Sequence, residues 1–151
     1  MTIFVDADAF PNALKEVLLR AVHKRTLTTL FVANKKISIP EVAYISMHIV
    51  PQGADEADHF IALTCKEGDI VITADIPLAD RIVSKGALGL DPRGTLYDEN
   101  NIKSLLAMRN LMQELRDAGE ITGGPSAIGE KQKRAFADAL NALLQRSNNA
   151  G

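Results

Sequence analysis

Short apolar runs alternate with longer stretches of helical periodicity along the chain. The short runs are rich in β-branched residues and end at glycine, proline or polar residues, which is typical of buried strands. In the longer stretches, apolar residues recur at helical spacing. The pattern predicts strands at residues 2–5, 30–32, 43–50, 69–73 and 87–90. It predicts helices at about residues 12–25, 54–66, 77–85, 102–119 and 136–144.

This alternation favours an α/β fold with a mainly parallel, five-stranded sheet that is covered by helices on both faces. The 151 residues fall within the usual size of one domain. We therefore expect a single domain over residues 1–146 and a frayed tail at residues 147–151. A glycine-rich turn is expected at residues 123–125.

Composition narrows the class of protein. The chain is 46% hydrophobic and 24% charged, as expected of a globular domain with a packed core. The one cysteine, Cys65, predicts no disulfide framework and no disulfide-linked partner. No stretch is long and apolar enough to cross a membrane, and without a signal peptide the cytoplasm is the expected location. The net charge of −2 gives no bulk attraction to nucleic acid, so RNA binding would need a local basic patch.

Carboxylates recur at the ends of the predicted elements. Asp6 and Asp8 follow the first strand, and Asp75 follows the fourth strand, directly before a helix that begins near Pro77. Asp55 and Asp58 lie one turn apart on the helix between them. If the first and fourth strands are neighbours, these acids converge at the carboxyl edge of the sheet, where ligands bind in open α/β folds. Oxygen-only ligands suit Mg²⁺ or Mn²⁺, and we expect Asp6, Asp8, Asp58 and Asp75 as the metal ligands.

Each of these acids also has an ordinary structural explanation. Asp8 and Asp75 are placed to cap helices, and Asp55 is a first-turn acid that the helix dipole favours. Asp58 is placed to face solvent. Asp6 is harder to explain in this way, because a carboxylate directly after a buried strand is poorly placed for solvation. The metal-site hypothesis therefore rests on the combination of acids and not on any single one.

Several polar side chains are candidates for substrate contacts. Arg93 lies in a turn after the fifth strand, where it either holds a phosphate or belongs to an ordinary surface turn. Asn34 and Lys35 follow the second strand and either contact a polyanion or form a solvated loop. Thr73 either orients Asp75 through a hydroxyl hydrogen bond or is a plain strand residue.

Two further residues are expected to have structural roles. Arg109 lies on a helix whose other face is expected to be core, which favours a surface or ion-pair role. His59 follows Asp58 directly, but a structural histidine is the favoured interpretation.

Motifs in the order of the chain resemble a known family. They are VDADAFP at 5–11, GADEAD at 53–58, VITADIPLA at 71–79, PRG at 92–94, MR at 108–109 and GGP at 123–125. Together they resemble the YaiI/YqxD family of uncharacterised bacterial proteins, which is regarded as PIN-like. The resemblance implies a three-layer α/β/α sandwich. Many PIN domains are Mg²⁺- or Mn²⁺-dependent ribonucleases with a ring of acids.

By motif, Asp6 and Asp75 match the PIN acids after the first and fourth strands, and either Asp55 or Asp58 matches the acid on the mid-chain helix. The catalytic residues implied are therefore Asp6, Asp55, Asp58 and Asp75. The chain departs from the family at Phe10, where cysteine is common.

Three functions remain open at this point. The first is a metal-dependent phosphodiesterase that acts on RNA. The second is a phosphatase of haloacid-dehalogenase type, in which Asp6 of the Asp6-x-Asp8 motif is a nucleophile and Asp75 with Asp80 forms the late acidic pair. Phe10 and the lack of a placed motif lysine disfavour this alternative. The third is a non-catalytic domain that binds RNA or a protein.

Overall fold

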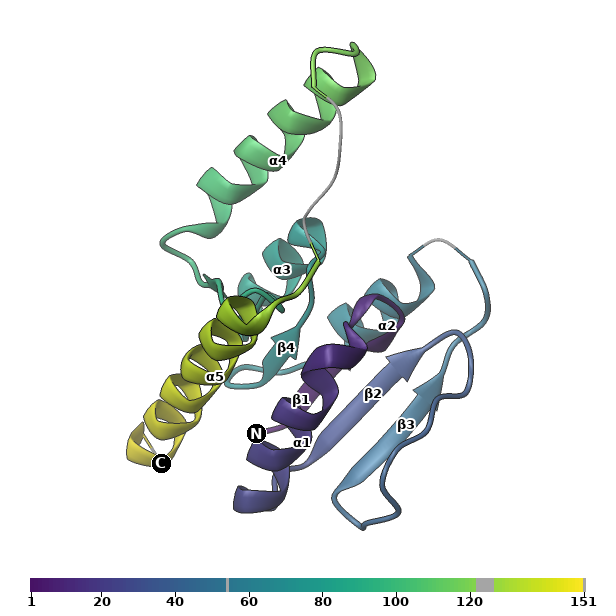
Figure 1. Cartoon of the computed structure of the whole chain (residues 1–151), viewed down its shortest axis with the longest axis vertical. Helices are drawn as coiled ribbons and strands as arrows, with labels where there is room; N and C mark the ends of the chain where they lie inside the picture. Colours follow the sequence, from purple (N-terminus) through teal and green to yellow (C-terminus); the bar gives the residue numbers. More distant parts are fainter. Residues whose placement is uncertain (54, 122–126, 151) are drawn as a thin grey trace.

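The computed structural model describes residues 1–53, 55–121 and 127–150, with side chains as far as residue 146, and shows an α/β fold (Figure 1). The elements are β1 (Ile3–Asp6), the short 3-10 helix η1 (Ala7–Ala9), α1 (Asn12–Arg25), β2 (Thr29–Ala33), β3 (Ile45–Ile49), α2 (Glu56–Thr64), β4 (Ile70–Ile72), α3 (Ile76–Val83), β5 (Leu88–Leu90), β6 (Leu96–Tyr97), α4 (Ile102–Asp117) and α5 (Glu130–Ala150). The predicted strands and helices are therefore present, with ends that shift by a few residues.

The sheet has the strand order β3-β2-β1-β4-β5-β6. The first five strands in this order are parallel, and β6 pairs antiparallel with β5. The prediction of five strands was wrong by one, because a two-residue strand is too short to show alternation in the sequence. Strand β1 lies directly beside β4, with Val5 opposite Ile72. The ends of β1 and β4 consequently meet at one edge of the sheet.

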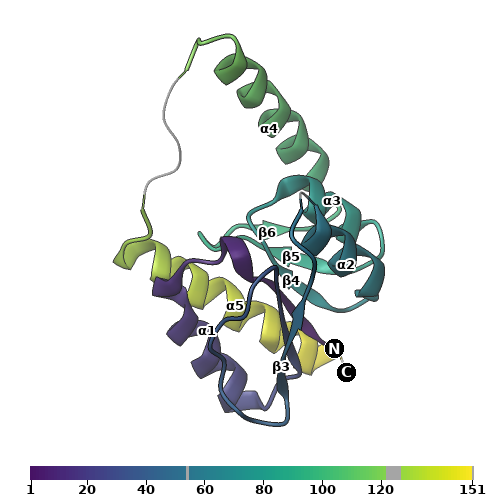
Figure 2. The ribbon, with the colours of Figure 1, turned by 90° about the vertical axis from the view of Figure 1, so that its right-hand side faces the viewer.

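The side chains of β1 alternate between two cores, one on each face of the sheet. Ile3 and Val5 pack in the core with residues of α1 and α5, and Phe4 packs in the core with residues of α2 and α3. The two pairs of helices lie on opposite faces of the sheet (Figure 2). The first core includes Leu14, Leu18, Phe31, Phe136 and Leu140. The second includes Val32, Ile61, Val71, Leu78 and Ile82. Burial on both faces explains why the central strands are apolar throughout, and it gives the fold its three layers.

Helix α4 departs from the prediction that one of its faces is core. Ile102 is buried, but the side chains of Met108, Leu111 and Met112 are 52%, 49% and 37% exposed. The helix packs against α3 near its start and then projects away from the sheet (Figure 1 and Figure 2). Helical spacing of apolar residues defines a face but does not specify what covers it.

Two predictions concern residues outside the described ranges. The expected first residue of the 54–66 helix, Ala54, and the glycine-rich turn at 123–125 lie outside the described residues. The single-domain boundary and the frayed tail stay predictions. Among the described helices, none has the length and apolar character needed to span a membrane.

Candidate functional site

Two neighbouring strand ends are connected by the Thr73 hydroxyl. Asp6 is the last residue of β1 and is 8% exposed, and Thr73 follows β4 and is 1% exposed. Thr73 Oγ1 donates a hydrogen bond to Asp6 Oδ2 over 2.9 Å. The same oxygen accepts the backbone N–H of Asp75 at 3.0 Å. The hydroxyl therefore fixes the Asp6 carboxylate and the backbone of Asp75 relative to each other.

Asp75 begins α3 and faces a carboxylate on α2. Its Oδ1 accepts the backbone N–H of Leu78 at 3.0 Å, so it is the N-cap of α3, with Pro77 in the first turn. Its side chain also shares a hydrogen bond with Asp58, which lies in the first turn of α2. Asp75 therefore caps α3 and also interacts with Asp58, so these two roles are not alternatives.

The electrostatics of these acids reflect burial and crowding. Burial raises the pKa of Asp58 most, the hydrogen bond with Asp75 and the charges of Asp75, Asp6 and Asp55 raise it further, and the result is about 7. Burial also raises the pKa of Asp6, and the charges of Asp75 and Asp8 act in the same direction, while the bond from Thr73 opposes them. Asp6, Asp58 and Asp75 therefore interact electrostatically, and we call them the acidic cluster.

Asp8 and Asp55 lie at the edges of the acidic cluster. Asp8 is exposed in η1, and its Oδ2 accepts the backbone N–H of Asn34 at 2.8 Å. That bond attaches the segment after β2, including the exposed Lys35, to the end of β1. Asp55 precedes α2 with a left-handed φ of 67°, which is uncommon for a residue other than glycine. Of the two helix acids left open by the sequence, Asp58 is the one that contacts Asp75.

A pocket of about 340 Å³ opens beside the cluster. It is lined by Asp55, Asp58, His59, Asp75, Pro77, Leu78, Arg81 and Arg109. Arg81 Nη2 donates to His59 Nδ1 over 3.3 Å. No sequence pattern indicated Arg81. Arg109 is exposed, in agreement with the surface role predicted for it, but its place in the lining of this pocket was not predicted. Only the MR motif at 108–109 signalled Arg109 in advance.

The other sequence candidates have structural contacts of their own. The backbone N–H of Arg93 donates to Asp91 Oδ1 at 2.6 Å, and Asp91 Oδ2 accepts the hydroxyl of Tyr97 at 3.0 Å. At Gly94, with φ of 97°, a Cβ atom would lie 2.8 Å from the backbone of Ala135 on α5. This close approach explains why the third residue of the PRG motif is a glycine.

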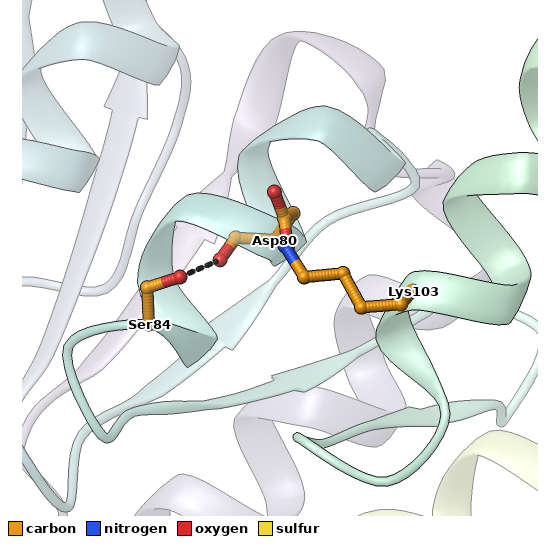
Figure 3. A network of polar contacts seen from close by, with 3 residues as sticks. All are labelled: Asp80, Ser84 and Lys103. Atoms are coloured by element: carbon orange, nitrogen blue, oxygen red, sulfur yellow. Dashed lines mark hydrogen bonds and ion pairs between the residues drawn. The ribbon is translucent and has the colours of Figure 1, made fainter.

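Asp80 forms an ion pair with α4 and not the late acidic pair that the phosphatase alternative requires. Lys103 Nζ lies 2.7 Å from its Oδ1, and the backbone oxygen of Asp80 accepts the hydroxyl of Ser84 at 3.0 Å (Figure 3). The ion pair connects α3 to the first turn of α4. Asp80 therefore helps to position α4.

The donor set of the acidic cluster fits a hard divalent cation. All of its side chains offer carboxylate oxygens, and the charges of neighbouring carboxylates add to burial in raising the pKa of Asp6 and of Asp58. In the described part of the chain, no three Asp, Glu, His or Cys side chains are already arranged around one metal position. A cation held by both Asp58 and Asp75 would take the place of the hydrogen bond between these two side chains.

Comparisons with known proteins agree on one family. Residues 4–146 match the family described as "Uncharacterized BCR, YaiI/YqxD family". A UPF0178 protein of Sulfurovum sp. (strain NBC37-1) is 54% identical over 97% of this chain and 99% of its own length. A UPF0178 protein of Maridesulfovibrio salexigens is 52% identical over 99% of both chains. A UPF0178 protein of Shewanella loihica is 47% identical over 97% of both. No solved structure gives a significant match.

Proposed function

The chain belongs to the YaiI/YqxD family, and we propose that it is a PIN-like, Mg²⁺- or Mn²⁺-dependent enzyme that hydrolyses phosphodiester bonds in RNA. The observation that carries the proposal is the acidic cluster. Asp6, Asp58 and Asp75 come from three separate elements and interact at the carboxyl edge of a parallel sheet. Repulsion among carboxylates costs folding free energy unless a cation or a proton joins them, and such a cost is typical of functional sites.

Each residue has a stated task in this proposal. Asp6, Asp58 and Asp75 hold the cation, and Asp8 contributes from the rim. When bound, a divalent cation lowers the pKa of a water molecule and stabilises the leaving oxygen. Thr73 keeps the Asp6 carboxylate in a fixed orientation toward the site.

Contacts to the RNA backbone are assigned to the rims of the site. Asn34 and Lys35 lie in the segment that Asp8 attaches to β1, which places them on the β2 side of the cluster. Arg93 follows β5 on the other side, in the turn that Asp91 and Tyr97 stabilise. Arginine and lysine side chains at these two places would hold phosphate groups on either side of the carboxylates.

The phosphatase alternative is less well supported. The haloacid-dehalogenase pattern needs Asp75 and Asp80 as a late acidic pair at the site. Asp80 is instead bound to Lys103 on α4 (Figure 3).

The test is hydrolysis of a fluorescent single-stranded RNA by the purified full chain, with Mg²⁺, with Mn²⁺ and with chelator. The proposal predicts cleavage that requires a cation and is lost in Asp6→Asn and Asp58→Asn. Asp138→Asn is the matched control, because Asp138 is an exposed acid on α5, away from the cluster. Absence of cleavage with both cations, or equal cleavage by Asp6→Asn, contradicts the proposal. Release of phosphate from a simple phosphomonoester that depends on Asp6 would favour the phosphatase.

A further inference from the structure

The pocket beside the acidic cluster has a basic wall as well as an acidic one. Asp55, Asp58 and Asp75 belong to its lining, and so do Arg81 from α3 and Arg109 from α4, which we call the basic wall. We propose that Arg81 and Arg109 form a phosphate subsite, which binds the phosphate next to the one that is cleaved on a single RNA strand. This inference rests on the proposed function, because it names how the substrate is held at that site.

The two arginines are held in place by different contacts. Arg81 lies in the last turn of α3, and its guanidinium donates to His59 Nδ1 at 3.3 Å. Arg109 comes from α4, which packs on α3 and is tied to it by the 2.7 Å ion pair of Lys103 with Asp80. The part of α4 that carries Arg109 otherwise exposes its side chains. Packing against the core therefore does not explain why this arginine lines the pocket.

The position of the two arginines in the pocket is also not explained by neutralisation of the charge of the acidic cluster. In the part of the chain that the structure describes, neither Arg81 nor Arg109 forms an ion pair with a carboxylate. Two guanidinium groups that share a pocket without a bound acid repel each other, and an anion between them removes that repulsion.

The chemistry of the pocket indicates the kind of anion. A guanidinium offers a planar set of donors that matches phosphate oxygens in two parallel hydrogen bonds. The volume of about 340 Å³ is at the small end of ligand pockets, which is enough for part of one strand and not for a duplex. Because the carboxylates and the arginines share the lining, a strand with one phosphate at the cation places a neighbouring phosphate at the basic wall.

The test measures binding of a fluorescein-labelled eight-nucleotide single-stranded RNA by anisotropy. Chelator is present throughout, so that no cleavage occurs, and the salt concentration is varied. Arg81→Ala and Arg109→Ala should each weaken binding about tenfold at low salt. Each should reduce the slope of log affinity against log salt by about 0.7, the value for one phosphate contact on a single strand. Arg109→Lys should keep the slope and lose part of the affinity, because the charge remains and the planar donors do not.

Arg116→Ala is the matched control, since Arg116 is exposed on α4 but does not line the pocket. It should leave the salt slope unchanged. If the wild type does not bind the RNA, or if the pocket variants have the same slope as Arg116→Ala, the subsite is overturned. Reduced slopes in a protein that does not cleave RNA would support the subsite and reject the proposed function. RNA cleavage together with unchanged slopes would support the proposed function and reject the subsite.

Discussion

Thr73 donates its hydroxyl hydrogen to Asp6 Oδ2 over 2.9 Å, and this bond joins the carboxyl ends of two neighbouring parallel strands. The hydroxyl oxygen accepts the backbone N–H of Asp75 in turn, so one buried side chain organises two members of the acidic cluster. The arrangement depends on β1 lying beside β4, because only adjacent strands bring positions 6 and 73 within hydrogen-bond distance.

Thr73→Val removes this hydroxyl while it keeps the shape of the side chain. The Asp6 carboxylate and the Asp75 N–H then lose a partner in a buried place, so we expect a loss of about 1–3 kcal/mol in the free energy of unfolding. The pKa of Asp6 should rise further, because the bond that opposes the effect of burial is gone. Chemical denaturation measures the loss. Thr64→Val, at an exposed position near the end of α2, is the control and should change stability little.

The stability of the metal-free protein should fall as the pH rises from about 4 to about 8. In the folded protein the pKa of Asp58 is raised from its ordinary value of 3.8 to about 7, so the folded state binds more protons than the unfolded state between these values. The contribution of this group is therefore complete below the lower pKa and is lost as the pH rises through the upper one. Melting temperatures in chelator across this range test the prediction.

Asp58→Asn should have a flatter pH profile than the wild type over the same range. The two proteins differ at this one side chain, so the difference between the two profiles isolates the carboxyl group. Identical profiles would mean that Asp58 has an ordinary pKa and that the acidic cluster is not coupled.

Asp69 is a buried acid with a structural role, and it serves as a comparison for the acids of the cluster. It lies at the start of β4, at the opposite edge of the sheet, and accepts the backbone N–H groups of Thr2 and Lys66, each at 2.8 Å. Asp69→Ala should destabilise the protein by about 1–3 kcal/mol, because both donors lose their partner. The response of its melting temperature to Mn²⁺ should equal that of the wild type. A lost response would show that the cation effect reports general stability and not the cluster.

Arg93→Ala and Lys35→Ala test the assignment of the two rims. Each should weaken oligonucleotide binding most at low salt, with a shallower salt dependence, because one phosphate contact is lost. Lys131→Ala, an exposed lysine on α5, provides the comparison. If Arg93→Ala and Lys131→Ala bind alike across the salt series, Arg93 belongs only to its turn.

The position of the acids could be predicted from the sequence because a simple geometric rule governs it. A carboxylate that follows a buried strand lies at the carboxyl edge of a parallel sheet, and Asp6 and Asp75 both satisfy this condition. The sequence left open whether the first and fourth strands are neighbours, and the structure shows that β1 and β4 pair directly. The antiparallel β6 was missed because two residues, Leu96 and Tyr97, carry no periodic signal.

The basic wall of the pocket could not be predicted in the same way. The direction of Arg109 depends on where α4 lies, and the spacing of Met108, Leu111 and Met112 indicated a buried face that the structure leaves exposed. The course of α4 is instead set by contacts between distant residues, including the ion pair of Lys103 with Asp80. Such pairs leave no local pattern in the sequence.

The central claim, that the acidic cluster holds a divalent cation, is tested most directly by melting temperature in chelator and in millimolar Mn²⁺. Binding at a hundredfold excess over Kd stabilises by about 2.7 kcal/mol, which is a rise of roughly 5–10 °C for a domain of this size. Asp6→Asn and Asp75→Asn should melt in chelator at or above the wild-type temperature, because each removes a repelling charge, and asparagine can still cap α3. Both should lose most of the rise in Mn²⁺. A wild-type protein that melts at the same temperature in both buffers would contradict the claim.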